Sequence, residues 1–250
     1  MIHNNKNTVP TRVPVRSLIL NVSPYLHDIS MEHRNEILRE LKRNLRRIPL
    51  LGGRVVEGAK GVSIVWAWGD CTEKDTDLSS PAEVSGILAS FTKKNRQASG
   101  SEETGVLQSR ATEPMFKDAI AKAVSVAQVV LQVCEDLSVK PHQNDTPSWQ
   151  ERFGLKHPLL CRFGICHGKL FNVGDSLSGL SLDVAADMAR MAPKSGLTCG
   201  PIVMHVLEEL LAEPGAISGL DGRKKPTLTS LDMQLIPSAQ IECPLWEIRF

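Results

Sequence analysis

The chain has 250 residues, of which 42% are hydrophobic, and a formal net charge of +1. This length can bury one substantial core or two small ones, and the near-neutral charge lacks the basic footprint of a duplex nucleic-acid-binding protein. No run approaches the roughly 18 apolar residues of a membrane-spanning helix. Six cysteines without a CxxC pair lie mostly in apolar runs, which favours reduced core thiols in an intracellular protein over a disulfide framework.

The first part of the chain predicts a flexible leader, a strand, a helix and a hairpin. Residues 1–13 carry basic residues and no acid, and Pro10 and Pro14 disfavour a transit-peptide helix, so we expect a disordered leader. Val15 to Val22 forms a β-type run, and Met31 to Ile48 places apolar residues along one helical face. The other face of this helix is largely basic, and a solvated face is favoured over a nucleic-acid or membrane surface. Arg54–Glu57 and Val62–Trp68 then form the predicted hairpin.

Two polar insertions interrupt the remaining pattern, at about 70–114 and 138–157. Between them, Phe116 to Leu137 is the most apolar helical pattern of the chain and should lie across a sheet. After them, Leu159–Ile165 and Leu170–Val173 predict two strands closed by a tight turn at Gly168.

The last part of the chain predicts a helix from Leu182 to Met191, a short strand, a helix from Ile202 to Leu211 and weak strand signals near Leu228–Ile236. Alternation of apolar and charged residues from Trp246 to Phe250 predicts a half-exposed edge strand. The order of elements predicts an α/β (α+β) fold, with a ferredoxin-like βαββαβ sheet, covering helices and extra C-terminal elements. Residues 14–250 should form a single domain with the two insertions.

Five segments, in this order, resemble the catalytic domain of class III nucleotidyl cyclases, the adenylate and guanylate cyclase family. They are Ser17–Tyr25, Leu51–Trp68, Phe163–Gly168, Gly179–Met191 and Ala192–Leu211. The resemblance covers most of the chain outside the insertions. It implies the cyclase fold, a head-to-tail dimer with active sites at its interface, and cyclisation of a nucleoside triphosphate with two divalent ions.

The resemblance also shows what has been replaced at the family's functional positions. Asn21 corresponds to one metal-binding aspartate, and Lys60 or Gly61 to the other. Asp183 and Asp187 stand where the family has an asparagine and an arginine, and would face a triphosphate with the wrong sign. We therefore expect no bound metal and no cofactor.

In the family, a pair of residues recognises the nucleotide base. Glu57 stands at one of these positions and suits guanine, whereas Leu180 stands at the other and does not match the family. Because both halves of the site are altered, complementation by a second chain is not available. These replacements predict an inactive pseudo-cyclase, not an enzyme, that serves as a scaffold or regulatory interaction module. It would pair with itself or another protein through the cyclase-type dimer face, and a place within a larger complex is compatible with this pairing. A divergent cyclase and a nucleotide-binding sensor are the alternatives. The cytoplasm is the expected compartment, and a mitochondrion or a flagellum is also compatible.

Other patterns allow a functional and a structural interpretation, and the structural one is favoured in each. Asp183 and Asp187 fit a solvated acidic face or an acidic helix start better than a new metal site. Cys161, Cys166 and His167 fit core residues better than a soft-metal cluster. Trp66 and Trp68 share one strand face and fit the core better than an interaction surface, and no nucleophile-elbow pattern marks a hydrolase.

Overall fold

The computed structural model describes residues 14–26, 29–58, 61–70, 114–140, 147–173, 176–193, 195–213, 215–217 and 226–249. The expected leader, Lys60, Cys71 and nearly all of the first expected insertion lie outside these residues. Within them, no helix is both long and apolar enough to cross a membrane.

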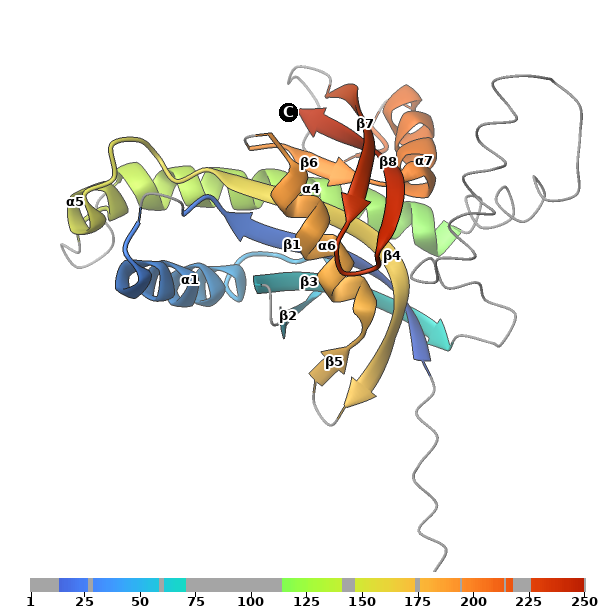
Figure 1. Ribbon diagram of the computed structural model, residues 1–250, viewed down its shortest axis with the longest axis horizontal. Helices are drawn as coiled ribbons and strands as arrows, with labels where there is room; N and C mark the ends of the chain where they lie inside the picture. Colours follow the sequence, from blue (N-terminus) through green and yellow to red (C-terminus); the bar gives the residue numbers. More distant parts are fainter. Residues whose placement is uncertain are drawn as a thin grey trace, which may run out of the picture.

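One mixed sheet of eight strands organises the chain (Figure 1). Its strands lie in the order β2-β3-β1-β4-β6-β8-β7, and the short β5 pairs with β4. The strands are β1 (Pro14–Pro24), β2 (Arg54–Gly58), β3 (Gly61–Asp70), β4 (Cys161–Val173), β5 (Ser176–Ser178), β6 (Leu197–Cys199), β7 (Thr227–Ile236) and β8 (Ile241–Arg249). The helices are α1 (Met31–Leu45), α4 (Pro114–Val139), α5 (Trp149–Phe153), α6 (Leu180–Met191) and α7 (Pro201–Ala212).

The predicted ferredoxin-like half is confirmed. The sequence β1-α1-β2-β3-α4-β4 produces the spatial order β4-β1-β3-β2, and every neighbouring pair in it is antiparallel. At the centre of the sheet, Leu20 lies opposite Ile64 of β3 and Ile165 of β4. A parallel pairing of β4 with β6, connected through α6, then adds the C-terminal strands.

The sheet has a core on each face. Leu18, Leu20 and Val22 of β1 pack in the larger core, together with buried residues of α1, α4 and α7. Ile19 points to the other face and packs in the smaller core with Val184, Ala185 and Met188 of α6. Alternation along β1 therefore places three helices on one face and α6 on the other, where Figure 1 shows it crossing the sheet.

The predicted turn at Gly168 is wrong, because β4 is one continuous strand of 13 residues. It pairs with β1 from Pro24 opposite Cys161 to Pro14 opposite Phe171, and this long ladder carries it past Gly168. Gly168 serves close packing instead, since a Cβ there would overlap the side chain of Ser181 on α6. The reversal into β5 comes only after Val173.

The C-terminal strand is also not at the edge of the sheet. β8 lies between β6 and β7, and β7 forms the edge. The charged residue Glu247 contributed to the prediction of a half-exposed strand, yet this residue is only 1% exposed in the structure. Its Oε2 accepts hydrogen bonds from Nε and Nη2 of Arg249, both at 2.7 Å, so the buried charge is paired.

Most of the expected core residues are confirmed where the structure describes them, whereas His167 is only half-buried. Trp66 and Trp68 are 5% and 8% exposed, and both belong to the larger core. The five described cysteines are buried and form no disulfide.

Candidate functional site

The first site position that the family resemblance implies, Asn21, lies in the middle of the sheet on the face that α6 covers. Asn21 of β1 lies opposite Ser63 of β3 on one side and opposite Gly164 of β4 on the other. Gly164 is needed for the close approach of α6, because a Cβ there would overlap the backbone of Ala185 and Ala189. Asn21 therefore sits between small neighbours beside the helix.

The side chain of Asn21 is buried, with 1% exposure. Its Nδ2 donates a hydrogen bond to Ser63 Oγ at 3.1 Å, whereas its Oδ1 has no partner among the described residues. A Cβ on Gly61 would lie 3.8 Å from this Nδ2, at ordinary van der Waals distance. A buried acceptor without a partner is costly, which makes Oδ1 the unsatisfied polar atom of the site.

These residues do not fit the two-metal site that the resemblance implies. Two divalent ions need several hard oxygen ligands, most of them carboxylates. Asn21 and Ser63 offer neutral oxygens, and the described part of the chain contains no cluster of three or more His, Cys, Asp or Glu side chains suited to a metal. Lys60, at the second metal position, lies outside the described residues.

Asp187 on α6 has a structural role. It is 3% exposed, and its Oδ2 accepts hydrogen bonds from the backbone N–H of Ser238, at 2.8 Å, and from the Ser238 hydroxyl. Arg190 Nη1 lies 3.6 Å from its Oδ1. Asp183, one turn earlier, is half-buried in the first turn of α6, where the helix dipole favours a negative charge. Asp187 thus anchors the β7–β8 turn to α6.

Glu57 and Leu180 are not brought together. Glu57 is exposed and forms an ion pair with Lys42 of α1, while Arg46 Nη2 lies 3.9 Å from its Oε1. Its neighbour Val56 packs in the core beneath α6, so the alternation of β2 turns Glu57 toward the α1 face. Leu180 begins α6 on the opposite face and is 38% exposed.

Comparison with known proteins identifies the fold. No family model matches the sequence, and no curated protein matches it. The adenylyl cyclase CyaB from P. aeruginosa matches the structure with a TM-score of 0.56 at 10% identity, covering 96% of both chains. An adenylate/guanylate cyclase/hydrolase from Silicibacter pomeroyi matches with a TM-score of 0.51 at 15% identity, covering 95% of this chain and 98% of that one. The chain has the fold of a class III nucleotidyl cyclase domain.

A third match is the catalytic core of a rhodopsin-guanylyl cyclase with converted specificity, solved with ATPαS, with a TM-score of 0.51 at 10% identity over 96% and 98% of the two chains. The prediction that this chain is not an enzyme is contradicted by these matches. The proteins that share its cyclase fold over nearly their whole length are adenylyl and guanylyl cyclases, which are enzymes. The comparisons lend no support to the scaffold interpretation either.

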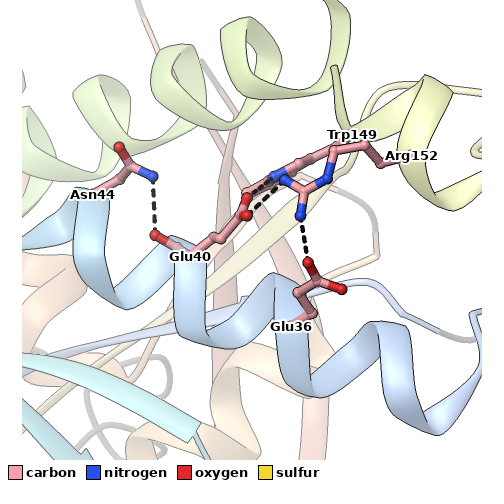
Figure 2. Close-up of polar contacts among 5 residues, drawn as sticks. All are labelled: Glu36, Glu40, Asn44, Trp149 and Arg152. Atoms are coloured by element: carbon pink, nitrogen blue, oxygen red, sulfur yellow. Dashed lines mark hydrogen bonds and ion pairs between the residues drawn. The ribbon is translucent and has the colours of Figure 1, made fainter. Parts of the chain in front are cut away.

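Away from the expected positions, the cyclase fold carries a polar cluster that the sequence analysis missed (Figure 2). Trp149 of α5 is fully buried, and its Nε1 donates to Glu40 Oε2 of α1 at 2.5 Å. Arg152 donates to Glu40 Oε1 at 2.6 Å and to Glu36. Burial opposes the charge on Arg152, but the hydrogen bonds and charges of Glu40 and Glu36 raise its pKa above the usual value.

A local signal marks this cluster in the sequence. Ser148 and Glu151 form a capping box at the start of α5, and Gly154 ends the helix with a φ of 64°. The spacing Ser-x-x-Glu before an apolar residue predicts such a helix start, even inside a polar segment.

Proposed function

We propose that this chain is a divergent nucleotidyl cyclase domain that binds a nucleoside triphosphate and works as a dimer. The observation that carries the proposal is the match of the whole fold to the adenylyl cyclase CyaB, over 96% of both chains.

In the proposed reaction, the ribose 3′ hydroxyl attacks the α-phosphorus, and pyrophosphate leaves. Catalysis of such a transfer rests on positioning and on stabilisation of developing negative charge. Asn21 and Ser63 contribute neutral dipoles on the α6 face, and Asp187 holds α6 against the β7–β8 turn. Since the described residues do not form the family's metal site, the proposal requires ligands at other positions.

A cyclase assay tests the proposal directly. The purified chain is incubated with Mn²⁺ and either ATP or GTP, and cyclic nucleotide is measured by chromatography and mass spectrometry. We expect product above the protein-free blank. Asn21→Asp should raise the rate, because a carboxylate attracts a cation more strongly than an amide does. Lys122→Ala on α4 is the remote control and should leave the rate unchanged. Absence of product from both nucleotides, for the parent and for Asn21→Asp, contradicts the proposal.

A sensor that binds nucleotide without turnover is the second candidate. The hydrogen bonds between Ser238 and Asp187 favour it, because they hold a buried carboxylate at the position of α6 where the family resemblance implies an arginine. Calorimetric titration with ATP and GTP, analysed beside the cyclase assay, separates the two. Heat of binding without product supports the sensor, and product supports the cyclase.

A further inference from the structure

The outer face of α1 and the turn after it carry a basic patch, defined here as Arg39, Arg43, Arg46, Arg47 and Leu51. All five residues are exposed. The arginines recur at spacings of three and four residues, so they form one stripe on the helix and its last turn. This stripe lies opposite Ile37, Leu41 and Leu45, which are buried in the core. The patch therefore faces solvent.

Nearby acids leave most of this positive charge uncompensated. Glu36 and Glu40 of the same helix are held by Arg152. Glu57 is bound to Lys42 and lies 3.9 Å from Arg46. The side chains of Arg39, Arg43 and Arg47 make no hydrogen bond or ion pair with any residue that the structure describes. The protein has a net charge of only +1, so the patch concentrates charge that the molecule as a whole lacks.

Leu51 is held outward by the turn after the helix. It has a φ of 51°, in the left-handed region that leucine rarely adopts, and it is 43% exposed. The Leu51 carbonyl accepts a hydrogen bond from Nε1 of the core residue Trp66 at 3.3 Å. The Leu50 carbonyl accepts one from the Gly53 N–H at 2.9 Å. These bonds fix an apolar side chain only four residues after Arg47.

We propose that this basic patch docks the chain onto the surface of an anionic phospholipid bilayer. Arginine guanidinium groups match the geometry of phosphate oxygens, and an anionic bilayer presents many of them in one plane. Leu51 would enter the boundary between head groups and acyl chains, where its apolar surface leaves water. A nucleic acid fits less well, because the patch has no aromatic side chain on which bases could stack and would leave Leu51 unused.

Vesicle co-sedimentation of the full chain tests this proposal. Vesicles of phosphatidylcholine alone are compared with vesicles containing about a third phosphatidylserine. We expect binding to the anionic vesicles only, weakening as salt screens the charges. Loss of each arginine should weaken binding by about fivefold, so Arg43→Glu with Arg47→Glu should weaken it well over tenfold. Leu51→Asn should also weaken binding while keeping the fold, because asparagine tolerates a positive φ.

Lys122→Glu is the matched control, since it makes the same charge change per residue on another helix. Among the described residues, Lys122 forms an ion pair with Asp118 at 2.6 Å, and losing such a surface pair costs little. The proposal is overturned if phosphatidylcholine vesicles bind equally well, if Lys122→Glu weakens binding as much as Arg43→Glu, or if Leu51→Asn has no effect. Tighter binding to a single-stranded oligonucleotide, with the same dependence on Arg43 and Arg47, would overturn it in favour of a nucleic-acid partner.

Discussion

Asp187 on α6 and Ser238 in the β7–β8 turn are joined by two hydrogen bonds to one carboxylate oxygen, from the Ser238 backbone N–H at 2.8 Å and from its hydroxyl. The two residues are 51 positions apart in the chain. This contact explains an aspartate at a position where the cyclase resemblance implies an arginine. A guanidinium cannot accept these hydrogen bonds.

Asp187→Ala should lower the free energy of unfolding by about 1–3 kcal/mol, because it removes the buried carboxylate that accepts both hydrogen bonds from the half-buried Ser238. Asp187→Arg should lower it further, since a cation would be buried without a partner. Asp183→Ala is the control, and loss of its interaction with the helix dipole should cost only about 0.3–1 kcal/mol. Urea unfolding followed by circular dichroism measures all three. Equal losses for Asp183→Ala and Asp187→Ala would contradict the anchoring role.

Arg152→Ala should detach α5 from α1. Its guanidinium binds Glu40 and Glu36, and removal takes a charged hydrogen-bond donor away from the largely buried Glu40 carboxylate. We expect a loss of about 2–3 kcal/mol, below the value for a fully buried pair because Arg152 is partly exposed. Hydrogen exchange should show faster exchange confined to α5. Arg152→Lys keeps the charge but not the fork-shaped geometry, and should recover only part of the loss. Unchanged exchange in α5 would show that Trp149 alone holds the helix.

Gly164→Ala should move α6 away from the sheet. A Cβ at this position would overlap backbone atoms of Ala185 and Ala189, which cannot turn aside as a flexible side chain can. We expect a loss of about 3 kcal/mol or more. Gly200→Ala is the matched control, since its Cβ would meet only Met188 Cε at 3.6 Å. That change should cost only about 0.5–1 kcal/mol, roughly the difference between glycine and alanine at a helix N-cap. Similar losses in both variants would refute the close approach of α6 to β4.

The buried thiols predict a fall in stability at alkaline pH. Burial raises the pKa of Cys199 and raises that of Cys243 to about 11. An unfolded thiol titrates near about pH 8.5, so the unfolded chain loses these protons first. Stability is therefore fully present below that pH and is lost as the pH rises through the folded-state values. The double variant Cys199→Ala, Cys243→Ala should show a shallower decline in unfolding free energy between pH 8 and 10. Parallel curves would show that other groups cause the decline.

Local patterns predicted most elements of the fold because each carries its own signal. The apolar spacing of α4 and the glycines around the β2–β3 hairpin are readable over short windows. The position of β8 was not readable, because Glu247 looks solvent-exposed until its pairing with Arg249 is known. Gly168 has the chemistry of a turn, and only the ladder with β1 shows that the strand continues.

The candidate site was harder to predict than the fold. Its positions were implied by a family resemblance, and what each side chain contacts depends on distant residues. Asp187 finds Ser238, and Glu57 turns to Lys42 on the other face of the sheet. Neither pairing can be predicted from local spacing, because each one joins two different structural elements. The Ser148–Glu151 capping box was a local signal, and it marks the start of α5, the helix that carries Trp149 and Arg152.

The ladder between β1 and β4 has a consequence for synthesis of the protein. β1 ends at Pro24, and its eleven partners on β4 begin only at Cys161. At a ribosomal rate of about 5–20 residues per second, the apolar strand waits roughly 10–30 seconds for its central neighbour. During that time only β3 of the β2–β3 hairpin can pair with β1, and the other edge of β1 stays unpaired. We therefore expect the nascent chain to rely on chaperones, and silent codon changes that slow translation between β3 and β4 should reduce the yield of folded protein.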